Sequence, residues 1–189
     1  MWNSLEIVKL VVGALTPLLV VGLGVFVTRA VRRLEDAQWA NRKVVERRLE
    51  LYDKMAPLLN DILCFFTAIG HFRDIDPPAL LAKKRELDKH FFVNEYLMSE
   101  AFAQRYKQFI ETCFRHYTGV GKDAEIRMEA DYLRDERGAA GWVSAWDDYF
   151  ADPAEVAEEG LVEKRYRVLM ETFSEQVGVR PADADRART

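Results

Sequence analysis

The sequence predicts an all-α protein, with one N-terminal transmembrane helix that continues into a cytoplasmic helical bundle of about four to six helices. Three features of the chain indicate this class. A long uncharged run lies near the N-terminus, apolar residues recur at helical spacing after it, and no segment alternates as a β-strand would. Of the 189 residues, 49% are hydrophobic and 31% are charged, which is enough for a buried core.

The composition also excludes several classes of protein. Two cysteines are too few for a disulfide scaffold. A formal net charge of -4 argues against a dedicated nucleic-acid-binding protein, because such proteins usually carry a marked basic excess. We therefore expect no nucleic-acid partner.

The first element, residues 1–28, is expected to be a transmembrane anchor. Its run Leu10–Thr28 contains no charged side chain and would span roughly 28 Å as a helix, close to the hydrocarbon thickness of a bilayer. A cleaved signal peptide would have a shorter apolar region and a cleavage site of small residues. A helix on the lipid surface would have a polar face, and a buried core helix is the remaining alternative.

The next element, residues 29–56, is expected to be a basic juxtamembrane helix. Basic flanks stay on the cytoplasmic side of the bacterial inner membrane, so the N-terminus should lie outside and residues 29–189 in the cytoplasm. The same side chains could also contact anionic membrane lipids. We call the following residues the basic collar: Arg29, Arg32, Arg33, Arg42, Lys43, Arg47 and Arg48.

Small residues recur on one face of the predicted membrane helix, at spacings of three and four. Small residues let two transmembrane helices approach closely, so this face favours a homo-oligomer. The alternative is that Gly and Pro are simply common in membrane helices. The small-residue face comprises Gly13, Pro17, Val20, Gly24 and Thr28.

Residues 57–178 are expected to form the cytoplasmic helical bundle. Apolar residues become regular from Val45, and Pro57 should kink or restart the helix there. Residue types that favour the N-cap position indicate where later helices start. These residues are Asp76, Ser99 and Asp152.

Three helices and a tail are expected after Asp76 and its helix. A helix with an aromatic face leads from Ser99 to a stop at Gly119. A shorter helix spans Asp123–Arg137, and the last one carries apolar residues from Val162 to Val177. Residues 179–189 are polar and aperiodic, so we expect a disordered tail.

The stretch Thr118–Asp123 superficially resembles a phosphate-binding loop. A P-loop requires G-x-x-x-x-G-K-[ST] after a strand, whereas here Asp123 replaces the hydroxyl residue and a helix comes first. A glycine helix cap and a turn explain the stretch fully. Contact with an anion or another small ligand, of unknown identity, remains an alternative for Gly119, Gly121 and Lys122.

No catalytic residue, cofactor or metal ion is predicted. Cys64 and His71 would be about 10 Å apart along a helix, whereas zinc–ligand bonds are roughly 2.0–2.3 Å long. Aspartates 147, 148 and 152 lie beside aromatic residues, but one wet and one buried helix face explain such a pattern. The three histidines belong to no arrangement that resembles a catalytic triad.

The loop His71–Pro78 is a candidate contact surface for a protein partner. It mixes aromatic, arginine and proline residues, a composition that is common at interfaces. An ordinary turn between helices is the alternative. The candidate contact residues are Phe72, Arg73 and Asp74.

Two stretches carry a resemblance to known proteins. Leu49–Asp76, with RLELYDKMAPLLNDI at its start, and YTGVGKDAEIR resemble uncharacterised bacterial single-pass membrane-anchored helical proteins. The resemblance covers about half of the chain. It implies the architecture and carries no activity.

Three classes of function remain. The leading hypothesis is a non-enzymatic inner-membrane protein whose cytoplasmic helical domain binds a protein partner or a second copy, as an anchor, adaptor or scaffold subunit. The second is an oligomerising, membrane-perturbing or pore-forming effector of a bacterial defence or toxin system, which the small-residue face favours. The third is a ligand-sensing or enzymatic domain that uses the loop Gly119–Asp123 or the cluster Asp147–Asp152.

Overall fold

The computed structural model describes residues 4–116, 124–138 and 141–178, and for residues 4–22, 30, 33–38 and 40 it describes the backbone alone. The described chain is mostly helical, which confirms the all-α class. It divides into two compact units, residues 1–44 and 45–189. The expected tail, residues 179–189, lies outside the described residues.

Helix α1 (Ser4–Thr67) is shared by both units. It contains Pro57, which removes one N–H donor from the helix, yet the helix neither ends nor restarts there. The helix ends where Ala68 adopts a positive φ of 52° and the Ile69 N–H donates to the Cys64 carbonyl, at 3.2 Å. A left-handed residue just after the last turn is a common helix end.

The predicted membrane helix forms the first part of α1. Its backbone is helical from Ser4, and residues 10–22 of its uncharged run lie outside the described side chains. Over the part of the chain that the structure describes, no helix is long and apolar enough to cross a membrane.

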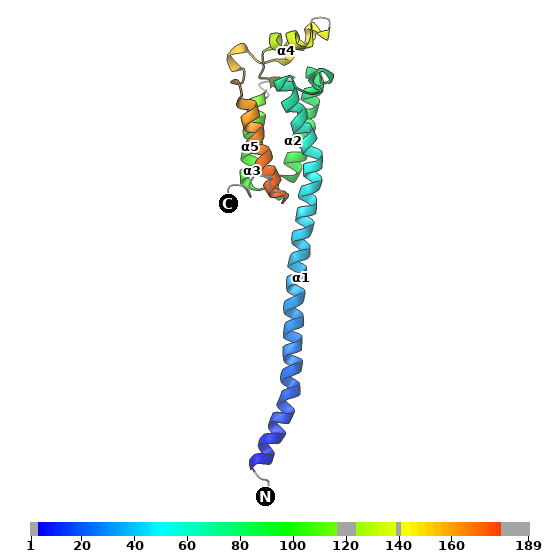
Figure 1. Cartoon of the computed structure of the whole chain (residues 1–189), viewed down its shortest axis with the longest axis vertical. Helices are drawn as coiled ribbons and strands as arrows, with labels where there is room; N and C mark the ends of the chain where they lie inside the picture. Colours follow the sequence, from blue (N-terminus) through cyan, green and yellow to red (C-terminus); the bar gives the residue numbers. More distant parts are fainter. Residues whose placement is uncertain (1–3, 117–123, 139–140, 179–189) are drawn as a thin grey trace, which may run out of the picture. The chain divides into compact units, whose positions relative to one another are not determined.

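The second unit packs the C-terminal part of α1 with α2 (Pro77–Asn94), α3 (Glu100–Cys113) and α5 (Leu161–Gln176). Helices α3 and α5 lie side by side, and α4 (Ala130–Arg137) lies across one end of the unit (Figure 1). Short 3-10 turns complete this unit: η1 (Phe72–Asp74), η2 (Glu95–Leu97), η4 (Ser144–Tyr149) and η5 (Pro153–Glu155).

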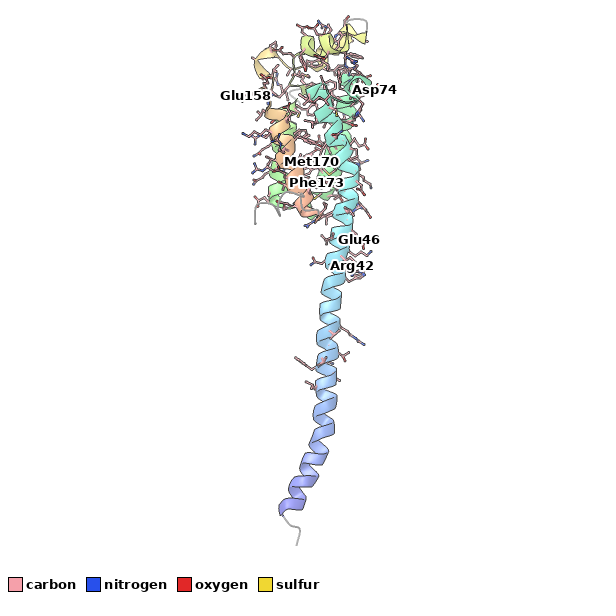
Figure 2. All side chains as sticks on the ribbon, in the orientation of Figure 1. Arg42, Glu46, Asp74, Glu158, Met170 and Phe173 are labelled. Atoms are coloured by element: carbon pink, nitrogen blue, oxygen red, sulfur yellow. The ribbon has the colours of Figure 1, made fainter. Side chains whose placement is uncertain are left out.

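Aromatic side chains join the helices of this unit in one core. Phe173 of α5, labelled in Figure 2, is fully buried. Its ring centroid lies 4.9 Å from that of Tyr52 on α1 and 4.5 Å from that of Phe102 on α3. Phe91 of α2 stacks on Tyr106 of α3 at 3.9 Å. Burying each such side chain stabilises the fold by about 1.5–3 kcal/mol, so four helices are held by one aromatic cluster.

The predicted caps Asp76 and Ser99 are confirmed for α2 and α3, whereas Asp152 starts only a 3-10 turn and α5 begins after Gly160. The Asp76 Oδ1 atom accepts from the Ala79 N–H at 2.7 Å, and the Ser99 hydroxyl accepts from the Phe102 N–H at 3.2 Å. Asp152 accepts from the Ala154 N–H at 3.2 Å and starts η5. These side chains satisfy N–H groups that have no partner inside the first turn.

The chain between α3 and α5 is less helical than predicted. Helix α3 ends at Cys113 instead of continuing toward Gly119, because β1 (Phe114–Arg115) pairs antiparallel with β2 (Glu125–Ile126). The predicted helix Asp123–Arg137 is therefore wrong in its first half, and only α4 remains of it. Both Phe114 and Ile126 are buried, so this short pairing covers apolar surface that a continued helix would place elsewhere.

Candidate functional site

Helix α1 exposes apolar side chains at the end of its uncharged run. Leu23 is 65% exposed and Phe26 is 70% exposed, and Val25, Val27 and Val31 are exposed as well. Successive residues of an α-helix point about 100° apart, so Val25, Phe26 and Val27 make this stretch apolar on several sides. Leaving large apolar side chains exposed to water costs free energy.

The described part of the small-residue face lies on the same stretch. A Cβ atom added to Gly24 would meet nothing within 4 Å, and the Thr28 hydroxyl donates to the Gly24 carbonyl at 2.8 Å. Because its hydroxyl is satisfied within the helix, Thr28 needs no water partner. The side chains of Gly13, Pro17 and Val20 lie outside the described residues.

The basic collar is only partly available to a partner. Arg48 is half-buried, and its Nε atom donates to the Leu97 carbonyl of η2 at 2.7 Å, so it supports the second unit. Arg47 pairs with Glu50 at 2.6 Å on the helix surface. The Arg33 side chain lies outside the described residues. The exposed collar residues are Arg29, Arg32, Arg42, Lys43 and Arg47; Figure 2 labels Arg42 and the nearby Glu46 on α1.

The predicted contact loop contains the turn η1. Phe72 is buried in the core, whereas Arg73 and Asp74 are exposed. Arg73 donates to the Glu136 carbonyl at 3.1 Å, and its guanidinium lies 5.4 Å from the centre of the Phe72 ring. The surface of this loop is therefore carried by Arg73 and Asp74, while Phe72 holds the loop to the fold.

Arg137 of α4 holds the same loop from the other side. Its guanidinium donates to the carbonyls of Phe72, at 2.6 Å, of Arg73, at 3.2 Å, and of Ile75. The group also lies 5.8 Å from the Trp146 ring centre. Burial lowers the pKa of Arg137, and the nearby Asp76 and Asp74 raise it. One planar cation thus satisfies three carbonyls that lie outside any α-helix.

A charged cluster joins α2 to α3 beside a cavity of about 390 Å³. The Tyr106 hydroxyl donates to Asp88 Oδ1 at 2.6 Å, and the Lys84 ammonium lies 2.7 Å from Asp88 Oδ2. Burial raises the pKa of Tyr106 well above its usual value, and the negative charge of Asp88 raises it further. The phenol therefore stays protonated and acts as a donor. Phe92 and His116 also line this cavity.

This cluster is suited to holding two helices together rather than to catalysis. The raised pKa keeps the Tyr106 hydroxyl protonated, and the Lys84 ammonium is held in an ion pair with Asp88, so neither group is an activated nucleophile. Lys84 and Asp88 are four residues apart on α2, a spacing that predicts an ion pair from the sequence. Nothing in the sequence pattern brings Tyr106 to them, because it belongs to another helix.

A larger cavity, of about 530 Å³, has an acidic rim that includes Glu129, Glu158 and Glu163. Arg127, which also lines it, donates to the carbonyls of Glu155, at 2.6 Å, and Glu111, at 2.8 Å. Its guanidinium is thus used to connect the end of α3 to the segment before α5. No described group in this cavity forms a recognisable catalytic arrangement.

The remaining candidates from the sequence contribute little to a site. Cys64 and Cys113 are free and buried, and burial raises the pKa of the Cys113 thiol although the positive charge of Arg127 lowers it. Among the described residues, no group of His, Cys, Asp and Glu side chains could hold a metal ion. The aspartate cluster is partly engaged, since Asp147 pairs with Arg134 at 2.7 Å. Gly119, Gly121 and Lys122 lie outside the described residues.

The second unit also carries an exposed apolar surface that the sequence analysis missed. At the end of α2 and in η2, Val93 is 71% exposed and Tyr96 is 99% exposed, and the neighbouring Phe92 is exposed as well. We call Phe92, Val93 and Tyr96 the α2 patch. Clustered apolar side chains on a surface are typical of protein–protein contact sites.

The chain matches no protein-family model, no curated protein and no solved structure. Its function is therefore inferred from its own residues. The features that bear on it are the exposed apolar part of α1, the basic collar and the α2 patch.

Proposed function

We propose that the protein is a single-pass protein of the bacterial inner membrane, with its N-terminus outside and residues 29–189 in the cytoplasm. In this proposal the helical domain is an anchor, adaptor or scaffold subunit that binds a protein partner or a second copy at the membrane surface. The observation that carries the proposal is the apolar side chains that α1 exposes from Leu23 to Val31, at the end of the uncharged run.

A membrane is the cover that suits this stretch best. Leaving a large apolar side chain in water forfeits about 1.5–3 kcal/mol, and Leu23 and Phe26 are both mostly exposed. A helix that packs on a protein core needs one apolar stripe, whereas a bilayer surrounds a helix on all sides. The absence of charge from Leu10 to Thr28 supports the same choice.

The exposed collar residues support the proposed orientation. Arg29 and Arg32 follow directly after the uncharged run and are exposed on α1. A cationic side chain near an anionic membrane surface contributes about 1 kcal/mol, and loops rich in Lys and Arg remain cytoplasmic. The collar would then hold the start of the cytoplasmic helix close to the lipid head groups.

The α2 patch supports a role in protein binding. The side chains of Val93 and Tyr96 are almost unburied although the core of the same unit is tightly packed. A Tyr side chain that becomes buried when a partner binds contributes strongly to binding, because it brings a large, rigid contact area and a hydroxyl group. No catalytic arrangement competes with this interpretation among the described side chains.

Carbonate extraction of membranes from cells that produce the tagged full-length protein tests the anchor. The unchanged protein should stay with the membrane pellet. Val20→Arg places a charge in the uncharged run at a cost of about 2.5–3.5 kcal/mol, so a large part of that variant should become extractable. The matched control is Val93→Arg, the same change in the cytoplasmic domain, which should stay in the pellet.

Two results would contradict the proposal. The first is release of the unchanged protein by carbonate, and the second is a soluble protein that lacks its N-terminal segment. The mass of the complex purified in mild detergent adds the second readout. A defined complex, with another protein or with a second copy, is expected, and a lone monomer would argue against the partner-binding role.

A further inference from the structure

Helix α1 carries a second, mostly apolar pattern, which leads from the end of the uncharged run to the helical bundle. Residues separated alternately by three and four positions form one stripe along the helix: Val27, Ala30, Leu34, Ala37, Asn41, Val44 and Arg48. The same alternation continues in the second unit as Leu51, Met55, Leu58, Ile62 and Phe65. There Met55, Ile62 and Phe65 are fully buried in the core.

The first part of this stripe has no cover where its side chains are described. Val27 is exposed, and so are Val44 and its neighbour Val45. Along the stripe, side chains are half-buried or buried from Arg48 onward. Arg48 itself donates to the Leu97 carbonyl and is the first stripe residue that contacts the bundle. A stripe that is covered by the chain itself after Arg48 is thus available to another molecule before it.

The spacing indicates which kind of molecule fits. Alternation of three and four gives a period of 3.5 residues, which keeps one seam facing a partner helix in a left-handed coiled coil. Residues 27–48 cover about three heptads, or roughly 32 Å of helix. A seam of this period is complementary to a second copy of itself.

We propose that residues 27–48 of α1 form a parallel, two-stranded coiled coil with the same segment of a second copy of this chain. The parallel direction rests on the proposed function, because two copies anchored in one membrane with the same orientation must run the same way. In the heptad of this stripe, Val27, Leu34 and Asn41 occupy position a, one of the two positions that face the partner helix. A single Asn at such a position pairs with its equivalent and selects an in-register dimer.

The charges of the collar fit this arrangement. With Asn41 as position a, the residues Arg29, Arg32, Arg42 and Lys43 take positions c, f, b and c, which face away from the seam. Of the flanking residues at position g, Arg33 would face Gln38 of the other copy, whereas Arg47 pairs with Glu50 of its own helix. In this heptad assignment the like charges that meet on the seam are the two Arg48 side chains at its end, and each of them donates to the Leu97 carbonyl of its own copy.

Cysteine cross-linking in membranes tests the seam on the full-length chain. Single cysteines would replace Leu34 and Val44 on the seam, and Trp39 and Glu46 on the outer face at position f. Copper phenanthroline should convert the two seam variants into disulfide dimers with at least ten times the yield of the two outer variants. The unchanged protein is the background control, because Cys64 and Cys113 are buried.

The mass of the full-length protein in detergent provides an independent measurement. The unchanged protein should be a dimer, Val44→Asp should be a monomer, and Trp39→Asp, the matched change on the outer face, should stay a dimer. The thermal unfolding midpoint of the helical domain checks that each variant is folded.

Equal cross-linking at seam and outer positions would overturn the proposal, as would a dimer that Val44→Asp leaves intact. The two proposals fail separately. A monomer that resists carbonate extraction overturns the coiled coil and leaves the anchor, whereas a dimer that carbonate releases overturns the anchor and leaves the coiled coil.

Discussion

At the scale of single residues, Asp88 is the centre of the charged cluster between α2 and α3. It accepts from the Tyr106 hydroxyl and faces the Lys84 ammonium, at 2.6 and 2.7 Å. Tyr106 is fully buried, so its neutral form is strongly preferred in the folded protein. The unfolded chain has no such preference, and this difference makes the stability of the protein depend on alkaline pH.

Replacement of Tyr106 by Phe tests this dependence. The folded pKa of Tyr106 is raised, so its stabilising effect is present below the unfolded pKa of about 10 and declines as the pH rises above it. Tyr106→Phe should cost about 1 kcal/mol at pH 8, because one hydrogen bond is lost. The difference in the free energy of unfolding between the unchanged protein and Tyr106→Phe should become smaller above pH 10, by up to about 1.4 kcal/mol per pH unit.

Thermal unfolding of the full-length protein in detergent, followed by circular dichroism between pH 8 and pH 11, measures this gap. Tyr132→Phe is the matched control, since Tyr132 is an exposed tyrosine of α4 and its removal should leave the pH profile unchanged. A Tyr106→Phe gap that stays constant up to pH 11 would show that this tyrosine ionises equally in both states.

Residue-scale features could be predicted where they depend on neighbours in the sequence. Asp76 and Ser99 are predictable caps because a capping side chain binds an N–H only three residues ahead. The contact of Asp88 with Tyr106 could not be predicted, since it needs the packing of two helices. The same holds for Arg137, whose acceptors lie more than 60 positions away in the chain.

At the scale of elements, α4 and the turn η1 are connected by Arg137. The guanidinium donates to the carbonyls of Phe72, Arg73 and Ile75, which lie between α1 and α2. This contact explains how a loop with two exposed polar residues is held in one conformation. It also gives α4, a short helix with one fully buried side chain, a role in the stability of the unit.

Arg137→Ala should lower the free energy of unfolding by about 2 kcal/mol, because three carbonyls lose a charged donor. Arg137→Lys should restore only part of this loss, because an ammonium group cannot reproduce the planar fork of a guanidinium.

The matched control is Arg134→Ala on the same helix. Arg134 forms exposed ion pairs with Asp131 and Asp147, so its removal should cost less than about 1 kcal/mol. Urea unfolding of the three variants measures these changes in the free energy of unfolding. Equal losses of stability for Arg137→Ala and Arg134→Ala would refute the structural role of Arg137.

The starts of α2 and α3 follow from the sequence because an apolar stripe and a capping side chain agree there. The segment after α3 was predicted poorly because its apolar residues, such as Phe114 and Ile126, satisfy a helical spacing and also a short antiparallel pairing. Local sequence cannot distinguish the two, since the choice depends on what covers these side chains. The sequence pattern suggests that Phe72 is exposed for partner contact, because it is an aromatic residue in a polar loop. In the structure it is buried in the core.

At the scale of the whole molecule, charge is distributed unevenly along the chain. The exposed collar residues follow the uncharged run, whereas the segment before the run contains one Lys and one Glu. In the proposed single-pass arrangement, the side with more Lys and Arg remains in the cytoplasm, so the collar rather than the bundle should determine the orientation. The α2 patch and the coiled-coil seam would then both be presented to cytoplasmic molecules.

Labelling of single cysteines with a membrane-impermeant maleimide tests this orientation in intact spheroplasts. Asn3→Cys should react before lysis, whereas Glu159→Cys, at an exposed position before α5, should react only after lysis. The unchanged protein controls for Cys64 and Cys113, which are buried and should stay unlabelled in the folded protein. Replacing Arg29, Arg32 and Arg33 together by Gln should place a measurable fraction of Glu159→Cys outside, because the charge difference across the membrane helix is then reduced. If Glu159→Cys reacts in intact spheroplasts while the collar is unchanged, the bundle lies outside the cell, and its partners belong to that compartment.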